Sequence, residues 1–316
     1  MSIASANQTI NWCPPVHRNV SPSNNPINVT LSPGFVVLIT GSSRGIGLAT
    51  AIAYAKAGAS AIMLTGRNKD ALNSAKKQVL ETAALVDKVQ GMQVETFACD
   101  VCSEEDTRSI ANYIQAKYGK LDALILNAGK ANGLVRDADG NMDWPHDASA
   151  LDLSDFRQTF EVNFFSGVVA IKYFIPLIQA AASGSPKSII WITSSSIHHY
   201  DPKFMAMGYS LSKFAAARFV EYVHEAHKDK GVTTFGIQPG SVMTDMSKYQ
   251  LPEGKGWEKI LIDNVNLGGA LCVWLTKERR EWLSGRWVDA RWDTDELERR
   301  KEDILTKNLL KFRMTA

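Results

Sequence analysis

A tyrosine and a lysine lie four positions apart in the segment Tyr209-Ser-Leu-Ser-Lys213. Residues four apart share one face of an α-helix, so the phenol and the ammonium can point into the same cleft. A tyrosine ordinarily titrates near ~10, and a neighbouring cation lowers that pKa because it favours the phenolate. This pair therefore predicts a general acid/base that works near neutral pH, provided that its helix lies at a ligand-binding edge.

Three glycines, Gly41, Gly45 and Gly47, follow an apolar run in the spacing G-x-x-x-G-x-G. Such a loop can make a tight turn, approach a pyrophosphate closely and aim a helix N-terminus at its negative charge. Because this loop follows a strand pattern and precedes a helix pattern, it predicts dinucleotide binding rather than an ordinary turn.

The second strand pattern ends in Gly66 and Arg67. An acidic residue at this place would accept a hydrogen bond from a ribose 2′-hydroxyl and favour NAD, but this sequence has none there. Arg44, inside the glycine loop, adds a second cation. Two guanidinium groups suit the extra charge of a 2′-phosphate. We therefore predict NADP(H) as the cofactor, and the alternative is that both arginines are solvated surface charges.

The elements that position these residues alternate between short β-rich runs and longer helical patterns. The expected strands are 35–39, 61–64, 94–98, 121–126, 188–192, 233–237 and 287–288, and the expected helices are 46–57, 69–88, 103–119, 154–182, 209–228, 267–275 and 294–310. This alternation implies parallel strands joined by right-handed crossovers. We predict an α/β protein: one doubly wound domain with a seven-stranded parallel sheet at 34–316, after an N-terminal surface arm at 1–33.

Composition narrows the function further. Apolar residues make up 45% of the 316 residues, and 35 Lys+Arg against 33 Asp+Glu leave a net charge of +2. This near balance leaves no excess of positive charge of the kind that binds nucleic acid or an anionic membrane. The apolar run 164–178 is interrupted by Lys172 and Pro176 and is too short to span a bilayer.

The N-terminal residues lack a basic stretch followed by an apolar one, so we expect no secretory signal and a cytoplasmic location. Four cysteines are too few for a disulfide scaffold. Cys99 and Cys102 form a C-x-x-C with no second ligand pair, so we expect two small buried residues and no metal site.

The chain also resembles the short-chain dehydrogenase/reductase family, in the branch with T-G-x-x-x-G-x-G and Y-x-x-x-K motifs. The resemblance extends over about residues 34–290. Besides the motifs above, it rests on Asp100-Val101, Asn127-Ala128-Gly129, Asn163 within Val-Asn-Phe-Phe-Ser-Gly, and Pro239 to Thr244. The leading arm and residues 283–290 resemble fungal members that tailor secondary metabolites. The fold implied is of the Rossmann type.

The resemblance implies a role for each residue. Tyr209 would be the proton donor in reduction and the base in oxidation, and Lys213 would hold the nicotinamide ribose and depress the Tyr209 pKa. Asn163 would hold a water molecule beside Lys213, and Ser194 would form a hydrogen bond with the substrate oxygen. The implied cofactor-binding residues are Gly41, Ser43, Arg44, Ile46, Gly47, Arg67, Asp100, Val101, Asn127, Ala128, Gly129, Tyr209, Lys213, Gly240, Val242 and Thr244.

The catalytic serine has more than one candidate, because Thr193 is followed by Ser194, Ser195 and Ser196. Aligning the preceding strand selects Ser194, whereas counting back from Tyr209 by the commonest family spacing favours Ser196. We choose Ser194, since strand register is harder to shift than loop length.

Three variable segments surround the expected site. Residues 130–153 form a polar insertion that includes Asp137 to Asn141, and residues 246–263 occupy the place of a substrate lid, with Tyr249, Leu251 and Trp257. The segment 198–207 is dense in His, aromatic and Met side chains. This density predicts an apolar pocket for a ring-bearing substrate, and ordinary loop packing is the alternative for each residue. His198 and His199 are expected to be polar loop residues rather than metal ligands.

These features predict an NADP(H)-dependent oxidoreductase that interconverts a ketone and a secondary alcohol on a small natural product. The alternatives are an isomerase or cyclase that keeps the cofactor as a scaffold, and a non-catalytic binding protein. The proton relay of Asn163, Tyr209 and Lys213 counts against both. The resemblance also implies a homodimer or homotetramer that pairs through the helices carrying Asn163 and Tyr209.

Overall fold

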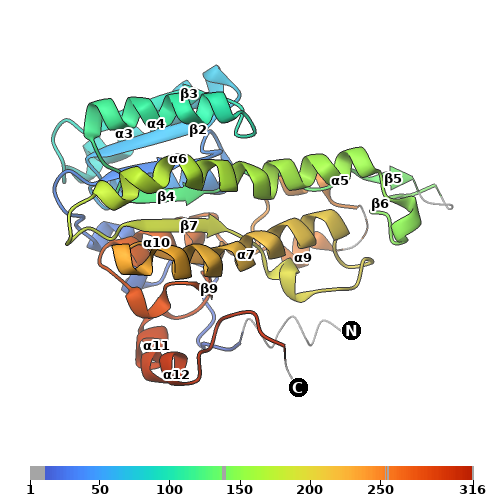
Figure 1. Cartoon of the computed structure of the whole chain (residues 1–316). Helices are drawn as coiled ribbons and strands as arrows, with labels where there is room; N and C mark the ends of the chain where they lie inside the picture. The colour runs from blue at the N-terminus through green and yellow to red at the C-terminus, as the bar shows by residue number, and fades with distance from the viewer. Residues whose placement is uncertain (1–10, 137–139, 253, 255, 315–316) are drawn as a thin grey trace.

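A computed structural model describes residues 11–136, 140–252, 254 and 256–314. Its main sheet is parallel, with seven strands in the order β3-β2-β1-β4-β7-β8-β9 (Figure 1). The strands are β1 (Val36–Ile39), β2 (Ala61–Gly66), β3 (Gln93–Ala98), β4 (Ala123–Leu126), β7 (Ser188–Ile192), β8 (Thr233–Gln238) and β9 (Arg286–Asp289). Strand order reverses between β1 and β4, which places a ligand crevice at the carboxyl ends of these strands. The predicted doubly wound fold is confirmed.

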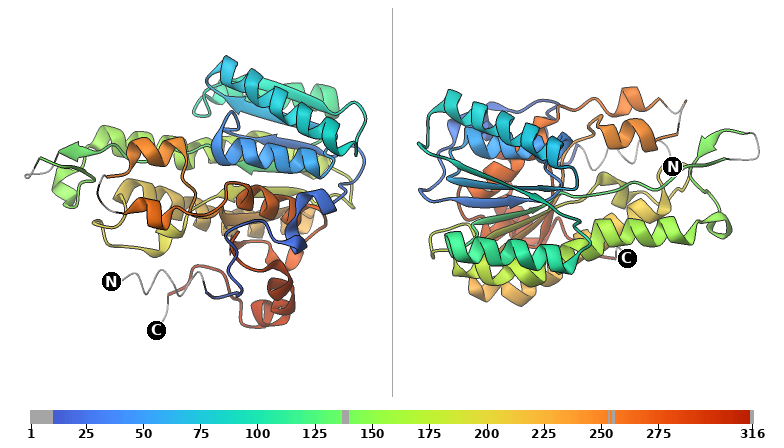
Figure 2. Two further views of the ribbon diagram at one scale, coloured as in Figure 1. Left: turned by 180° about the vertical axis from the view of Figure 1, so that it is seen from behind. Right: turned by 90° about the horizontal axis from the view of Figure 1, so that it is seen from above.

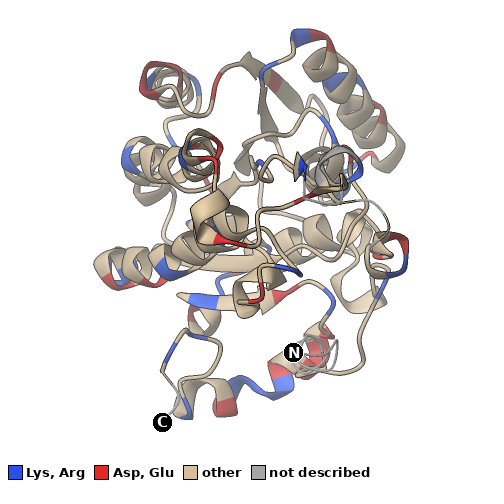
Figure 3. Cartoon of the chain, turned by 90° about the vertical axis from the view of Figure 1, so that its right-hand side faces the viewer, with Lys and Arg blue, Asp and Glu red and all other residues tan. Residues whose placement is uncertain are grey.

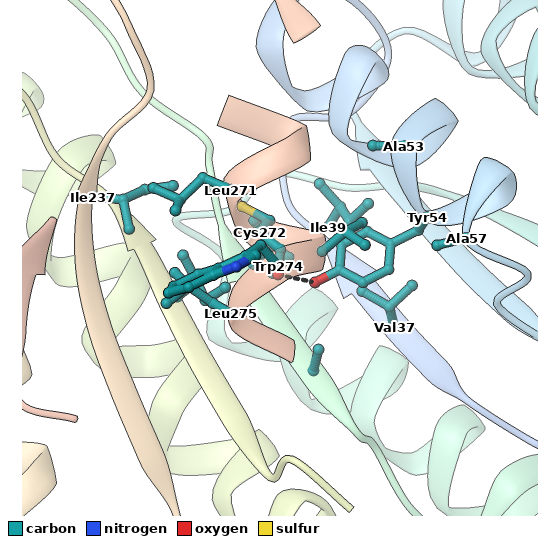
Figure 4. Packing of buried hydrophobic residues seen from close by; sticks show 14 of the residues in the cluster. Val37, Ile39, Ala53, Tyr54, Ala57, Ile237, Leu271, Cys272, Trp274 and Leu275 are labelled. Atoms are coloured by element: carbon teal, nitrogen blue, oxygen red, sulfur yellow. Dashed lines mark hydrogen bonds between the residues drawn. The ribbon is translucent and has the colours of Figure 1, made fainter. Parts of the chain in front are cut away.

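Helices cover both faces of the sheet (Figure 2). One layer holds α2 (Gly45–Lys56), α3 (Lys69–Val86) and α10 (Asn266–Thr276), and the other holds α4 (Glu104–Tyr118), α6 (Ser166–Ala180) and α7 (Met207–His227). Because strand side chains alternate, Val37 of β1 enters the core under the first layer and Leu38 enters the core under the second. Figure 4 shows how Tyr54 joins α2 to α10, its hydroxyl donating to the Cys272 carbonyl at 3.3 Å.

The structure differs from the expected elements in three places. The long helix predicted at 154–182 is divided into α5 (Leu153–Phe160), a π-helical turn (Glu161–Phe165) and α6. The helix predicted at 294–310 is wrong as one unit, because it breaks at Arg300 into α11 (Thr294–Arg299) and α12 (Lys301–Thr306). The insertion contains a small antiparallel hairpin, β5 (Val135–Arg136) and β6 (Met142–Asp143), and the lid segment contains α8 (Asp245–Gln250) and α9 (Trp257–Ile260).

The continuous helical run Leu153–Ala180 is long and apolar enough to cross a membrane by length and composition alone, and an 18-residue stretch of it has a mean hydropathy of 1.4. In this fold its α6 part packs on the sheet instead, with Ile171, Phe174 and Ile178 buried in the core that α6 shares with α4 and α7. A buried face of this kind is what a core helix of a doubly wound domain requires.

The described part of the N-terminal arm, from Asn11 onward, is packed rather than loosely attached. Cys13 is fully buried, and the Trp12 ring lies 5.0 Å from the ring of Trp292. Further along, the Lys88 ammonium donates to the carbonyl of Val29 at 2.6 Å. In Figure 2 the arm (dark blue) lies beside α10 and α11. Residues 1–10 lie outside the described part.

Candidate active site

The predicted motifs meet at one edge of the sheet. Gly41 follows β1, Asn127 follows β4, Ser194 follows β7 and Gly240 follows β8. Parallel strands direct all their carboxyl ends to the same edge, so these residues converge although they are far apart in sequence. Figure 3 looks onto this edge and shows basic and acidic segments interspersed on it.

The glycine loop and the end of β4 are bonded into one unit. Gly41 has a φ of +64° and Gly45 a φ of +57°, in the left-handed region that favours glycine. A Cβ on Gly47 would lie 2.4 Å from the Gly41 carbonyl oxygen and 2.5 Å from Asn127 Nδ2. The Asn127 amide donates to the Gly41 carbonyl at 2.9 Å, and the Ala128 N–H donates to the Thr40 hydroxyl at 3.1 Å. A side chain at position 47 would therefore collide with the loop and with Asn127, so this glycine lets the start of α2 pack closely against both.

The two arginines predicted to bind phosphate have different surroundings. Arg67 follows β2 and is exposed. Arg44 Nη1 lies 3.4 Å from Asp245 Oδ2, with side chains 70% and 48% exposed. Because Asp245 is the first residue of α8, this weak surface pair connects the glycine loop to the lid segment. Ser43, next to Arg44 in the glycine loop, packs against the end of β2. Its Oγ is 3.2 Å from the position that a Cβ on Gly66 would take.

Asp100 and Val101 follow β3, as predicted. The Asp100 carboxylate accepts from the Cys102 N–H at 3.0 Å, which holds the turn. Val101 lines a small pocket together with Thr65, Ala128 and Trp191. Cys99 is buried but Cys102 is exposed, so the expectation of two buried cysteines is wrong for Cys102. A turn residue carries its side chain outward even where the strand before it is buried.

Tyr209, Lys213 and Ser194 come together where α7 passes the end of β7. The buried Lys213 Nζ donates to the Ile192 carbonyl at 2.8 Å and lies 5.9 Å from the centroid of the Tyr209 ring. The Tyr209 and Ser194 hydroxyls share a hydrogen bond. Ser196, the other candidate, has its hydroxyl buried, and its N–H donates to Ser194 Oγ at 3.1 Å. Ser194 is thus the serine that reaches Tyr209.

The electrostatics of this pair differ from the sequence expectation. Burial raises the pKa of Tyr209, and the hydrogen bond with Ser194 offsets only part of that rise. Burial also lowers the pKa of Lys213 to about 8. Loss of water disfavours both charged forms, and this outweighs the attraction expected between a phenolate and an ammonium. The predicted lowering of the Tyr209 pKa is therefore wrong for the chain by itself, and Tyr209 is a protonated phenol at neutral pH.

Asn163 lies in the π-helical turn and is 1% exposed. Its Oδ1 accepts from the Lys130 N–H at 2.7 Å, and its Nδ2 donates to the Lys130 carbonyl at 2.8 Å. A Cβ on Gly129 would lie 3.4 Å from both Asn163 Oδ1 and Lys213 Nζ, so only a glycine leaves the space between them open. π-Turns often occur at functional sites, and this one aims Asn163 at the end of β4.

Sequence reasoning missed Asn132, which holds the helix of Tyr209 from outside. The N-cap of α7 is Ala206, which has no side-chain acceptor, so the Tyr209 N–H is left without a local partner. Asn132 Oδ1 accepts this N–H at 2.7 Å, and Asn132 Nδ2 donates to Asp155 Oδ2 at 2.8 Å. Asn132 lies five residues after Asn127, and no local pattern indicates that it caps a helix about 75 positions later.

Asp155 of α5 completes this arrangement. Its carboxylate also receives the Lys130 ammonium and the Gly133 N–H. Although burial alone would raise it, the pKa of Asp155 is held below its ordinary value by hydrogen bonds from Lys130, Asn132 and Gly133. We call Lys130, Asn132, Asp155 and Asn163 the acid/base frame, because they connect Asn163 to the backbone of Tyr209.

The loop after β8 approaches the glycine loop. Gly240 has a φ of +104°, and Val242 forms a bridge with Ile262. Thr244 caps α8: its N–H donates to Ser247 Oγ at 2.7 Å, and its methyl lies 3.9 Å from the position of a Cβ on Gly45. The predicted cofactor residues on β8 and β1 therefore face each other.

The three variable segments each contribute to one group of rings. The Trp144 and Trp257 centroids are 5.6 Å apart, those of Phe204 and Trp257 are 6.2 Å apart, and those of His199 and Phe204 are 4.7 Å apart. We call Trp144, Phe204, Trp257 and His199 the ring cluster. Trp144 is 3% exposed yet belongs to neither core of the sheet. Partial burial lowers the pKa of His199.

Other residues predicted near the pocket lie elsewhere. His198 packs against Trp287 at 4.8 Å and Phe312 at 5.8 Å, on the side of β9 and the C-terminal tail. Tyr200 is 78% exposed. The side chain of Tyr249 and residues 137–139 of the insertion lie outside the described part of the chain.

Comparison with known proteins identifies the class. The family model described as short chain dehydrogenase matches residues 35–254. Short chain dehydrogenase pgmD of Aspergillus terreus is 34% identical over 317 residues, which covers 100% of this chain and 98% of the relative. Short chain dehydrogenase citE of Monascus ruber is 32% identical over 281 residues, which covers 89% of each chain. Both relatives are fungal, as the sequence resemblance predicted.

Solved structures agree on the fold. L-sorbose reductase from Gluconobacter frateurii, solved with NADPH and L-sorbose, has a TM-score of 0.66 at 22% identity and covers 84% of this chain and 97% of its own. Other solved neighbours carry NADH or NAD. The chain belongs to the short-chain dehydrogenase/reductase family and is an oxidoreductase with a nicotinamide cofactor.

Proposed function

We propose that this chain transfers a hydride between NADP(H) and the carbonyl or carbinol carbon of a small ring-bearing molecule. The observation that carries the proposal is the cluster of Tyr209, Ser194, Lys213 and Asn163 beside the glycine loop. A proton donor, a hydroxyl for the substrate oxygen and a buried cation are the parts that carbonyl reduction needs from the protein.

The sheet edge beside the glycine loop has features that fit a dinucleotide. The loop leads directly into the N-terminus of α2, whose first backbone N–H groups would bind a pyrophosphate. Arg44 and Arg67 would hold a 2′-phosphate, Val101 would contact the adenine, and Val242 and Thr244 would hold the carboxamide. When bound, the nicotinamide supplies or accepts the hydride.

The residues of the chain then manage the proton. The Ser194 hydroxyl donates to the carbonyl oxygen of the substrate and stabilises negative charge as it develops there. The raised pKa keeps Tyr209 protonated, so its phenol is ready to give a proton to that oxygen. Lys213 stabilises the phenolate that remains, and Asn163 holds the backbone at Lys130 beside it. A protonated phenol at neutral pH favours the reductive direction.

The ring cluster supports a ring-bearing substrate. Trp144, Phe204 and Trp257 come from three segments that border the site, and they meet outside both cores of the domain. Aromatic side chains prefer offset-stacked or edge-to-face partners, so a flat substrate would gain contacts that a small acyclic one lacks.

The test is turnover of the purified chain with NADPH or NADH and a panel of aryl ketones, with product masses measured. We expect NADPH consumption and a product two hydrogens heavier than the ketone. Tyr209→Phe should lower kcat by about 10²–10⁴-fold. A product of unchanged mass would instead favour an isomerase or cyclase, and normal turnover of Tyr209→Phe would refute the assigned acid/base.

We also propose that two copies pair through α6 and α7. Phe165, at the end of the π-helical turn that leads into α6, is 47% exposed, and Leu211 and Tyr222 on α7 are 50% and 67% exposed. Three large apolar side chains on neighbouring helices are more than a surface needs by chance. Light scattering should give at least twice the monomer mass, and Leu211→Glu should reduce it.

A further inference from the structure

The N-terminal arm sends one cation into the interior of the domain. Arg18 Nη1 lies 2.7 Å from Asp263 Oδ1, and the Asp263 side chain is 0% exposed while Arg18 is 43% exposed. Exposed ion pairs contribute little, but a buried carboxylate depends strongly on its partner. Arg18 is therefore more than a solvated surface charge.

Asp263 in turn fixes the loop after β8. Its other oxygen, Oδ2, accepts from the Ser241 N–H at 2.6 Å, and its own N–H donates to the Ser241 carbonyl at 3.0 Å. The next pair along, Val242 and Ile262, forms an antiparallel bridge. Asp263 therefore sets where the chain from Ser241 to Thr244 runs.

The arm is held in place at Arg18 by its backbone as well. The Arg18 carbonyl accepts from the Asn264 N–H at 2.9 Å, and the preceding His17 N–H donates to the Arg291 carbonyl at 2.7 Å. The His17 ring also lies 2.8 Å from the Asp293 carboxylate. The guanidinium consequently approaches Asp263 from a fixed backbone.

Arg291 does not replace Arg18. Its guanidinium is paired with Asp289, to which Nε donates at 2.9 Å, and its Nε is 3.9 Å from Asp263 Oδ2. Without Arg18, Asp263 would keep the Ser241 N–H but lose its close cation. A buried carboxylate in that state either takes up water or moves.

We propose that Arg18 is a positioning residue for the nicotinamide end of the cofactor site, acting through Asp263 on the segment Ser241 to Thr244. The inference rests on the proposed function, because it assigns Val242 and Thr244 to the carboxamide. It gives the arm a role in positioning the cofactor, although the arm lies outside the residues matched by the family model, 35–254. The adenosine end, with Gly41, Gly47 and Arg67, has no contact with Arg18 among the interactions of the described residues.

The test separates the two ends of the cofactor. Arg18→Met removes the cation but keeps a side chain of similar length, and Arg18→Lys keeps the charge. Calorimetry would measure the affinity of each variant for NADPH and for 2′,5′-ADP, which lacks the nicotinamide. We expect Arg18→Met to weaken NADPH binding about tenfold and to lower kcat, while its affinity for 2′,5′-ADP stays within about twofold of that of the unchanged chain. Arg18→Lys should recover part of both the NADPH affinity and kcat.

Arg299→Met is the matched control, because Arg299 is 67% exposed and pairs only with Glu296 on α11 among the residues described. It should bind both nucleotides like the unchanged chain. Equal weakening of both nucleotides in Arg18→Met would overturn the inference and make Arg18 a general stability residue. No change in either would also overturn it.

Failure of the proposed function gives a different pattern. The same titrations are run with NADH and with 5′-AMP, which lacks the nicotinamide. The effect of Arg18→Met is then judged on whichever cofactor the unchanged chain binds more tightly: NADPH compared with 2′,5′-ADP, or NADH compared with 5′-AMP. Tighter binding of NADH would refute the NADP(H) assignment while still testing Arg18. If the unchanged chain bound none of the four nucleotides, both the proposed function and this inference would fail.

Discussion

The acid/base frame and the ring cluster border the same site but are held by different forces. In the frame, Asn132, Asp155 and Asn163 are connected by hydrogen bonds of 2.7–2.8 Å. In the ring cluster, His199, Phe204 and Trp257 meet through ring contacts of 4.7–6.2 Å. Hydrogen bonds are directional and lose their strength when groups rotate, whereas ring contacts tolerate several arrangements. Under the proposed function, we therefore expect the chemistry to depend on fixed positions and substrate binding to depend on adaptable ones.

This contrast predicts that changes near the frame lower kcat and that changes in the ring cluster alter KM and substrate choice. The largest effect should come from Lys213→Met. The variant removes the buried cation beside Tyr209, which offsets the phenolate charge, so kcat should fall by about 10²–10⁴-fold. Single-turnover reduction with NADPH measures it, and a change confined to KM would place Lys213 outside the chemistry.

Asn132→Ala should have the next largest effect. It leaves the Tyr209 N–H without its partner and removes one of the two hydrogen bonds to Asp155 Oδ2, which should cost about 1–3 kcal/mol of unfolding free energy. We expect kcat to fall about 10- to 100-fold, because small displacements of a catalytic group are costly. The control is Asn28→Ala at an exposed asparagine. Loss of stability with unchanged kcat would mean that the frame supports the fold alone.

The pH dependence should reflect Lys213. Its pKa is lowered to about 8, so it is a cation below that pH and neutral above it. The rate of reduction should therefore be level at neutral pH and fall about tenfold per unit as the pH rises beyond about 8. The residual rate of Lys213→Met should lack this inflection. An inflection that persists in the variant would belong to another group.

The smallest effect should come from Trp257→Leu, because it removes ring contacts and leaves the frame intact. An aromatic pair contributes about 0.5–1.5 kcal/mol, so KM for fused-ring ketones should rise about threefold to tenfold while kcat stays nearly constant. Small acyclic ketones should show no change. A uniform fall in kcat for every ketone would instead show that the two regions are not separable.

The fold was predictable because its signals are local. Most strands of the main sheet are apolar on both faces, as in β1 and β4, and β7 was predicted with its observed bounds, Ser188–Ile192. The glycine loop and the Tyr209–Lys213 spacing are local in the same way. Their meeting follows from parallel strands, whose carboxyl ends share an edge.

The rest depends on contacts between distant segments. Asn132 caps α7 only because the chain after β4 runs beneath Ala206, and the π-turn at Asn163 has no sequence signature. The direction of the Tyr209 pKa was wrong because spacing indicates a neighbouring cation but not the loss of water. Likewise, nothing in the sequence distinguishes Arg18 from other polar residues of the arm, because its partner Asp263 is distant in the chain.

One glycine has a consequence for how this enzyme can change over generations. A Cβ on Gly208 would lie 2.8 Å from Asn132 Nδ2 and 3.0 Å from the Phe156 ring. Alanine at 208 would therefore displace the Asn132 amide, which holds the Tyr209 N–H, although alanine is the better helix former. A lineage that acquired alanine there would have to adjust both Asn132 and Phe156 to keep Tyr209 in place. We therefore expect position 208 to vary together with these two neighbours.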